Sequence, residues 1–501
     1  LALQIASLAD LSPLKIPAPD SNGRILISVA ELQSNYDTKF CQLNATVTMQ
    51  APQCQADIAY ISQQSGTGYF DLNQKPIQNN TVGVTGVLFQ PITYSTTVPL
   101  PAGEQTFSVS GGLIMPQGIG KDKIKGVITY FHATAFNNSK VGSDYTTNGE
   151  TQLVSEVFAS QGYIVVIPDY VGQGVDWQNV HPYVLYPQVS NKTAVDMLNS
   201  VLPKIREEYG LTDSEQLKLF AGGYSEGGAY AAWLPIYLLN NQNVLNPAYQ
   251  FKHSVGMEGA YATSAVMKGF LFDNVNQGDG NQYNIQTQAL TNVAKPVLSA
   301  DTFLSYATYQ LAGNMPSVFN MDFYNMNCSL PYAQANCDFS YEGSVQHVNM
   351  SEAFAQSNSS AQVPAIVYSA LNKSLNNATY PLRTELPYSF KNSVNPLTSS
   401  EMFTPQGQSQ LDNTLMAAQV NLASLAGQLV SIVSLDLDSV VTPNNYSWLL
   451  ATYPSKIRDH YLVSADSILV RDPGQNEYVP VDHLRGLIYE YLYALNIFNQ
   501  F

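Results

Sequence analysis

A serine flanked by glycines is the feature that points most directly to chemistry, in the segment Gly223-Tyr224-Ser225-Glu226-Gly227. The segment fits the pattern G-x-S-x-G, in which a serine occupies a tight, strained turn between a strand and a helix. The glycines leave room for neighbouring backbone, and the helix that follows directs free N–H groups at developing negative charge. The segment therefore predicts Ser225 as the nucleophile of an acyl-transfer reaction, with a glycine-rich packing turn as the alternative.

A serine nucleophile needs a histidine as its base. The chain has six histidines, which are His132, His181, His253, His347, His460 and His483. Where a serine follows this pattern, the acid and then the histidine come later in the chain. This order excludes the first two histidines, and the next two precede the last strands expected for the core. His483 comes directly before the final amphipathic helix and is the predicted base, while His460 is the alternative, a histidine within a strand.

The acid of such a triad is expected in the loop after a strand over residues 428–435. Two carboxylates stand there, Asp436 and Asp438. Asp438 is the predicted acid, because it is followed by two valines and then a proline, as expected of a loop that leaves a strand. Asp436 is the first alternative, and Glu258 is the second, since some enzymes with this serine pattern place the acid one strand earlier. The acid would hold the imidazole in the correct tautomer and stabilise its cation.

Two backbone N–H groups should form an oxyanion hole. One is predicted to be that of Glu226, the residue after the nucleophile. The other should come from the loop after a strand over 125–131, where His132-Ala133-Thr134 stands. Thr134 is the predicted second donor and Ala133 the alternative. His132 is predicted to brace the loop by hydrogen bonding.

Strand-like and helix-like segments alternate around these residues. The predicted strands cover residues 82–89, 106–115, 125–131, 162–167, 216–221, 253–257, 428–435 and 458–463. The predicted helices cover 151–160, 192–209, 229–239 and 484–498. Such alternation is typical of an α/β fold with a mostly parallel central sheet and flanking helices. It also places Ser225 at the strand-to-helix turn that the pattern requires.

The chain is predicted to divide into four parts. Residues 1–85 form an N-terminal extension, 86–261 the first part of the α/β core, 262–425 an inserted cap and 426–501 the second part of the core. The cap is rich in aromatic residues that could form a pocket wall, among them Phe303, Tyr306, Tyr309, Phe319, Phe323 and Tyr324. We expect it to cover the active site and set substrate choice, and the alternative is a decorative subdomain with its own small core.

Composition and charge favour an exported protein. Charged residues make up 12% of the chain, against an average of about 25% in globular proteins. The formal net charge of −16 repels phosphate, so we expect no nucleic-acid partner and no electrostatic docking on anionic membranes. No apolar run approaches the roughly 18 residues that a transmembrane segment needs.

Four cysteines form two sequence-local pairs, which predict the disulfides Cys41–Cys54 and Cys328–Cys337. Disulfides imply an oxidising compartment, so the protein is expected to be secreted or periplasmic. A zinc site is the less favoured alternative because no C-x-x-C spacing occurs, and unpaired buried thiols are another. Ten N-x-[ST] sequons, including Asn44, Asn191 and Asn377, permit glycosylation without establishing it.

Three motifs resemble those of the secretory lipase and cell-wall esterase group. Phe131-His132-Ala133-Thr134 resembles its F-H-G-T oxyanion loop, and residues 168–174 followed by His181-Pro182-Tyr183 resemble its P-D-Y-x-G-x-G…H-P-Y stretch. Residues 223–228 match its nucleophile turn. The resemblance covers about residues 105–262 and 428–490, and it departs from the group at Ala133, where glycine is usual.

The resemblance implies an α/β-hydrolase fold and hydrolysis of carboxylic esters without a metal or cofactor. The substrate would be a small-molecule or lipid ester, with interfacial contact through the cap. Two alternatives stay open, a serine peptidase of the same fold and a non-catalytic binding protein that retains the fold. Neither a propeller nor a site for peptide termini is visible in the sequence, and both the serine and the histidine are present, so an esterase or lipase is favoured.

Overall fold

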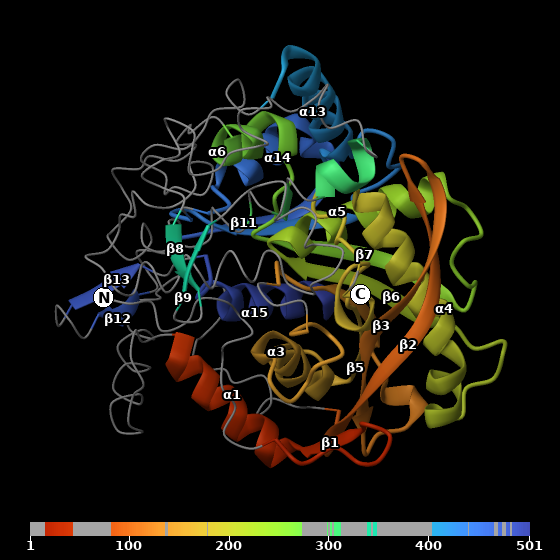
Figure 1. The fold of residues 1–501 in the computed structure, drawn as a ribbon. Coiled ribbons are helices and arrows are strands. Elements are labelled where there is room, and N and C mark those ends of the chain that lie inside the picture. Colours follow the sequence, from red (N-terminus) through yellow and green to blue (C-terminus); the bar gives the residue numbers. More distant parts are fainter. Residues whose placement is uncertain are drawn as a thin grey trace.

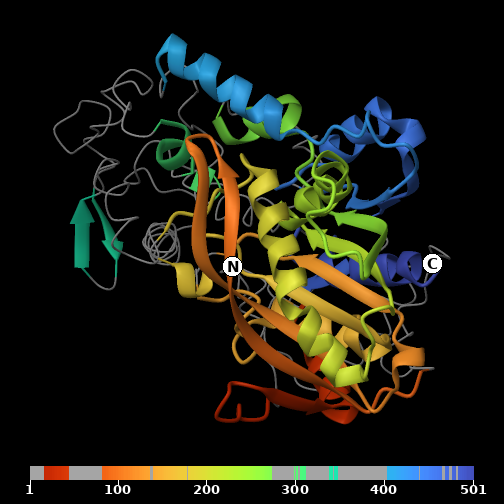
Figure 2. The same ribbon diagram turned by 90° about the vertical axis from the view of Figure 1, so that its right-hand side faces the viewer.

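The computed structural model describes residues 16–43, 82–135, 139–177, 179–272, 298, 301–302, 305–311, 338–341, 344–347, 403–438, 440–464, 469–472, 477–480 and 483–501. A large twisted sheet runs through the middle of this part of the chain (Figure 1). Helices pack against both faces of the sheet, and a long hairpin curves away from it (Figure 2).

The central sheet has nine strands in the order β1-β2-β3-β5-β4-β6-β7-β10-β11. They are β1 (Ile25–Ser28), β2 (Gly86–Leu100), β3 (Gly103–Gln117), β4 (Gly126–Phe131), β5 (Tyr163–Pro168), β6 (Leu217–Tyr224), β7 (Tyr249–Met257), β10 (Val430–Leu435) and β11 (Ile457–Val463). From β5 to β11 all neighbouring strands are parallel, whereas β1, β2, β3 and β5 pair antiparallel. Two small antiparallel pairs lie apart from this sheet, β8 (Asp338–Tyr341) with β9 (Ser344–His347) and β12 (Leu469–Asp472) with β13 (Glu477–Pro480).

The sheet lies between two layers of helices. One layer contains α4 (Pro187–Tyr209) and α5 (Glu226–Asn240), and the other contains α1 (Val29–Leu43), α3 (Gly149–Val157) and α15 (Leu487–Phe498) (Figure 1). Strands β4, β5 and β10 are buried along their whole length, as expected when helices cover both faces. The mostly parallel sheet with flanking helices that the sequence predicts is confirmed.

Further helices follow β7 in the inserted segment or follow β10. They are α6 (Lys268–Phe272), α13 (Pro405–Ala418) and α14 (Asn444–Thr452), with the π-helical turns η5 (Thr263–Met267) and η7 (Tyr306–Leu311). Short 3-10 turns connect the core elements, namely η2 (Lys121–Lys123), η3 (Ala159–Gln161), η4 (Gly174–Asp176) and η9 (Pro454–Lys456). The sequence alone indicated neither α14 nor α13. Helix α14 is short, and α13 lies in the region expected to be a cap.

The hairpin of β2 and β3 is much longer than the sequence predicts. Each strand has 15 residues, whereas the predicted strands ended at residue 89 and began at residue 106. The strand β2 contains two prolines, Pro91 and Pro99. Both are tolerated because β1 pairs with β2 only over Gly86–Phe89, so that the rest of that edge of β2 forms no ladder with β1.

The segment predicted as an N-terminal extension supplies part of the sheet. Strand β1 pairs with β2, and α1 follows it directly. Lys39 of α1 forms an ion pair with Glu156 of α3 at 2.5 Å, and both side chains are fully buried. Residues 16–43 are therefore tied to the core by backbone pairing and by a buried charge pair.

Several predictions fall outside the described residues. Cys54, Cys328 and Cys337 lie there, as does the side chain of Cys41, and so do most of the residues from 273 to 402. Both disulfides and the cap stay predictions. Among the sequons, Asn191 is fully buried and its amide donates to the carbonyl of Tyr230 at 3.0 Å, which leaves no room for a glycan. Within the described residues, no helix is long and apolar enough to cross a membrane.

Candidate active site

Ser225 lies at the turn between β6 and α5, in the backbone conformation that a nucleophile turn requires. Its φ is +59° and its ψ −117°, a strained combination for a residue other than glycine. Its N–H donates to the carbonyl of Met257 at 2.9 Å, which fixes the turn to β7. A Cβ on Gly223 would lie 2.1 Å from the carbonyl oxygen of Gly227, and one on Gly227 would lie 1.9 Å from that of Phe131. The two glycines are therefore required by close backbone approach.

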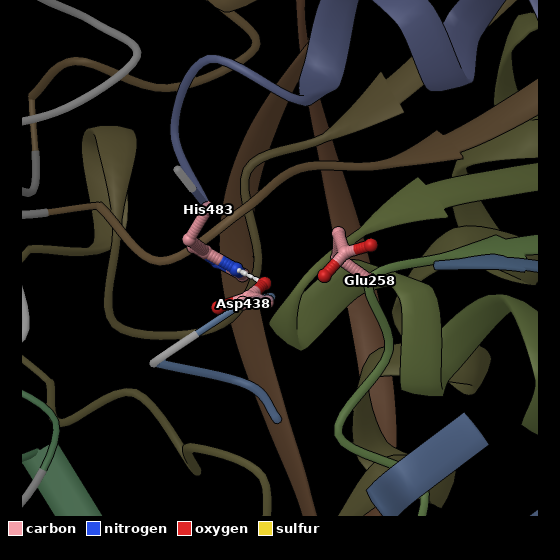
Figure 3. Close-up of side chains that lie close together, drawn as sticks. All are labelled: Glu258, Asp438 and His483. Atoms are coloured by element: carbon pink, nitrogen blue, oxygen red, sulfur yellow. Dashed lines mark hydrogen bonds and ion pairs between the residues drawn. The ribbon is translucent and has the colours of Figure 1, made fainter. Parts of the chain in front are cut away.

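His483 connects Ser225 to Asp438. Its Nε2 lies 3.0 Å from the Ser225 hydroxyl oxygen, and its Nδ1 lies 2.5 Å from Oδ2 of Asp438. The dashed line in Figure 3 marks the second of these contacts. The other carboxylate oxygen of Asp438 accepts the N–H groups of Val440 and Val441, at 2.8 and 3.1 Å. Three residues far apart in the sequence thus form one hydrogen-bonded chain.

The charge state of Asp438 follows from its surroundings. The carboxyl group is fully buried, and burial by itself raises its pKa. The positive charge of His483 and the hydrogen bonds that the carboxylate accepts outweigh burial, so the pKa of Asp438 is lowered below its ordinary value. An ionised Asp438 can hold the Nδ1 proton of His483 and leave Nε2 facing the serine.

The alternative residues lie in other surroundings. His460 is exposed on β11 and its Nδ1 lies 3.3 Å from the hydroxyl of Tyr446. Asp436 is half-buried at the end of β10, where its N–H donates to the carbonyl of Val463. His253 is buried in β7, where burial and then the charge of Arg458 lower its pKa to about 3. None of these three contacts Ser225 in a contact that the structure describes.

The loop after β4 lies beside the start of α5, as expected for an oxyanion hole. The N–H of Ala133 donates to Oε1 of Glu150 at 2.9 Å, so that donor is already committed. Thr134, the next residue, is half-buried, and its hydroxyl pairs with that of Tyr183 at 2.9 Å. Glu226 is the first residue of α5. These contacts favour Thr134 over Ala133 as the second backbone donor.

His132 braces this loop. Its Nδ1 lies 2.6 Å from the carbonyl oxygen of Ala133 and its Nε2 lies 3.1 Å from that of Asp169. Its ring stacks on Tyr170 with the centroids 4.1 Å apart, and the Tyr170 hydroxyl donates to the carbonyl of His132 at 2.8 Å. The position of His132 agrees with the bracing role expected from the sequence.

A second histidine contacts the residue that follows the nucleophile. His181 Nε2 forms a short contact with Oε1 of Glu226, and the hydroxyl of Tyr230 donates to the same oxygen at 2.8 Å. The ring of His181 also stacks on Tyr170, with the centroids 5.0 Å apart. Tyr170 and His181, both in the motif over residues 168–183, therefore stack with His132 of the loop after β4.

Glu258 adds a second acidic group beside Asp438 and His483 (Figure 3). Glu258, Asp438 and His483 each place one atom within 4.8 Å of the others, a spacing that could also hold a metal ion. A cation bound at Nδ1 would displace the proton through which His483 binds Asp438. The side chains of Asp438 and His483 already form hydrogen bonds to each other and to protein groups. The arrangement therefore fits an acid–base pair better than a metal centre.

The sequence did not indicate two supporting residues, Tyr224 and Glu150. Tyr224 donates from its hydroxyl to the backbone carbonyl of His483 and thereby holds the histidine loop against β6. Glu150 holds Ala133, and its Oε1 also accepts the Tyr130 hydroxyl at 2.7 Å. Only Tyr224 carried a signal, since it stands inside the glycine-flanked segment.

No protein-family model matches the chain, and no curated protein matches it in sequence. Solved structures do resemble it. A provisionally assigned hydrolase from Legionella pneumophila has 17% identity and a TM-score of 0.53, over 88% of this chain and 94% of that one. The rice cell wall degrading esterase LipA from Xanthomonas oryzae has 14% identity and a TM-score of 0.54, over 85% of this chain and 93% of that one. At such identities the likeness concerns the fold, and the chain has the α/β-hydrolase fold.

Proposed function

We propose that this protein hydrolyses carboxylic esters through an acyl-enzyme on Ser225. The observation that carries the proposal is the position of His483, with Nε2 at 3.0 Å from the serine hydroxyl and Nδ1 at 2.5 Å from Asp438. A strained serine, a base within hydrogen-bond reach and a buried acid that orients the base are the parts that nucleophilic acyl transfer needs. The presence of an esterase among the structures with this fold supports the same proposal.

In the proposed mechanism, His483 Nε2 takes the proton of Ser225 as the hydroxyl oxygen attacks the ester carbonyl. The N–H groups of Glu226 and Thr134 would stabilise the resulting oxyanion. Protonated His483 then gives its proton to the leaving alcohol. A water molecule that His483 activates hydrolyses the acyl-enzyme and restores Ser225.

The insertion after β7 is proposed to shape the substrate site. In the part of it that is described, Tyr309 is buried, and its hydroxyl donates to the carbonyl of Val180, which precedes His181. Its ring also packs on Tyr186 with centroids 6.1 Å apart. This part of the insertion therefore contacts the segment that supports Glu226. We further propose a small-molecule or lipid ester as substrate and a secreted or periplasmic location.

Ester hydrolysis by the wild type and by Ser225→Ala tests the function. We expect the wild type to hydrolyse short p-nitrophenyl esters and a fluorophosphonate to label Ser225 stoichiometrically. Ser225→Ala should remove both, because within the described residues Ser225 is the nucleophile that lies against Nε2 of His483. The control is Ser447→Ala, a change in α14. Peptide cleavage without esterase activity would favour a peptidase. A wild type that shows no hydrolysis and is not labelled would favour a binding protein.

A further inference from the structure

Three carboxyl groups lie together, fully buried, on the side of His483 that faces away from Ser225. Glu258 follows β7, Asp438 follows β10 and Glu490 lies in the first turn of α15. Figure 3 shows the carboxyl group of Glu258 on the same side of His483 as Asp438. The proposed mechanism assigns a role to Asp438 and none to the other two groups.

The backbone fixes Glu258 firmly. Its φ is +46°, which is unusual for glutamate, and its N–H donates to the carbonyl of Val433 at 3.0 Å. Its Oε1 accepts the N–H of Leu435 in a short hydrogen bond. The carboxyl group therefore bridges β7 and β10 at the point where the chain continues to Asp438.

The second carboxyl oxygen of Glu258, Oε2, is buried and accepts no hydrogen bond from the described residues. An ionised carboxylate with an unpartnered oxygen in this position would be costly. The oxygen becomes satisfied if it carries a proton, because it can then donate to the neighbouring carboxylate of Asp438.

The surrounding charges favour that proton. The titratable groups around the Glu258 carboxyl group are Tyr224, Tyr261, Asp438, His483 and Glu490. Burial and then the negative charges of Glu490 and Asp438 raise the pKa of Glu258 well above its ordinary value. The pKa of Glu490 is raised as well, chiefly by burial, whereas that of Asp438 is lowered. Carboxyl groups this close cannot all ionise, and Asp438 is the one paired with His483.

We propose that Glu258 is a neutral carboxylic acid whose Oε2–H donates a hydrogen bond to the Asp438 carboxylate, which makes it a positioning residue for the triad. The proposal rests on the esterase function stated above. The Asp438 carboxylate then accepts hydrogen bonds from two backbone N–H groups, from the imidazole of His483 and from the Glu258 acid. A second anion in this position would instead add to the negative charge that acts on His483.

The substitution Glu258→Gln separates these two states. Glutamine has the shape of the neutral acid: its Oε1 can accept from Leu435, and its Nε2–H can donate to Asp438. E258Q should therefore keep kcat/KM within about threefold of the wild type, with the acidic limb of the pH profile unmoved. If Glu258 were ionised, E258Q would remove a negative charge beside the base. Protonation of His483 would become less favourable, and the acidic limb would move to lower pH by about one unit or more.

A second substitution measures the hydrogen bond. Glu258→Met has a similar length but cannot donate, so kcat should fall about 10- to 100-fold with little change in KM, because the orientation of Asp438 and His483 is disturbed. Thermal unfolding shows whether E258M is folded. The matched control is E490Q, which removes a buried carboxyl group from the same cluster and should leave the acidic limb where it is. An E258M enzyme that is folded and fully active would overturn the positioning role.

Infrared difference spectroscopy tests the proton without relying on catalysis. The difference between the wild type and E258Q at pH 7 should show the loss of a protonated carboxylic acid band. Loss of a carboxylate band instead would overturn the proposal, whatever the enzyme's substrate. A wild type that hydrolyses no ester would contradict the proposed function, while the spectrum would still decide the state of Glu258.

Discussion

Within the described residues, two histidine–carboxylate pairs lie close to Ser225 in the fold. His483 pairs with Asp438, and His181 pairs with Glu226. Both carboxylates are fully buried, and the side chains of the two histidines are only 13% and 8% exposed. The pairs differ in the second ring nitrogen. That of His483 faces the Ser225 hydroxyl, whereas that of His181 lies 3.1 Å from the carbonyl oxygen of Val171.

The comparison shows that a buried histidine–carboxylate pair is not by itself an acid–base catalyst. Both nitrogens of His181 face protein oxygens, so the ring has no nitrogen left for a reacting group. It can hold Glu226 in place, and Glu226 carries a proposed oxyanion donor in its backbone. His483 has the same kind of partner but keeps one nitrogen for the nucleophile. The atom that faces the second ring nitrogen of each histidine decides whether the histidine positions a residue or transfers a proton.

The largest effect should come from the acid of the first pair. In Asp438→Asn the amide can donate to Nδ1 and favour the wrong imidazole tautomer, so kcat should fall on the order of 10⁴-fold, as in other triads. Steady-state kinetics on a short-chain ester would measure it. Asp436→Asn is the matched control, two residues earlier in the chain, and should stay within about threefold of the wild type. A reversal of the two effects would assign the acid to Asp436.

The order of residues along the chain was enough to propose Ser225, Asp438 and His483, because a glycine-flanked serine followed by an acid and a histidine is a local and ordered signal. The second pair gave no comparable signal. His181 and Glu226 are 45 residues apart, and only the fold brings them together. Glu258 was considered solely as an alternative acid, since a sequence does not show which of several buried carboxyl groups keeps its proton.

The elements of the fold also differed in whether a local sequence pattern predicted them. Continuous apolar runs such as that of β5 and the helical period of α4 predicted the parallel core closely. The sequence underestimated β2 and β3 because polar residues and prolines interrupt their alternation. It also missed β1, whose four residues form a strand through pairing with β2. Local patterns identified elements whose own sequence shows a buried apolar face. They failed for strands that form through pairing with a neighbouring strand.

The second pair should give an intermediate effect. His181→Phe keeps a ring that can stack on Tyr170 but removes the partner of Glu226. We expect kcat to fall about 10- to 100-fold through displacement of the Glu226 N–H, a loss of the size that small misplacements cause. The control is His460→Phe, which replaces an exposed histidine on β11 and should leave kcat unchanged. If His181→Phe were fully active, Glu226 would not depend on His181 for its position.

The smallest effect on catalysis should come from a third buried charge pair, that of Lys39 and Glu156. It faces neither the serine nor the oxyanion loop, and it joins α1 to α3. Burial raises the pKa of Glu156 to about 7, although the charge of Lys39 acts in the opposite direction. A substitution at this pair should change the free energy of unfolding and its pH dependence, while kcat/KM of the folded enzyme stays the same.

The sign of this pH dependence follows from the direction of the shift. The pKa of Glu156 is higher in the folded protein than its ordinary value of 4.5, so folding takes up a proton between these two values. The stabilisation is complete below pH 4.5 and is lost as the pH rises through about 7. In urea unfolding, the wild type should lose on the order of 3 kcal/mol over this range relative to Glu156→Gln, which cannot titrate. An equal pH slope in the two proteins would mean that Glu156 is ionised throughout, as the partner of a charged Lys39.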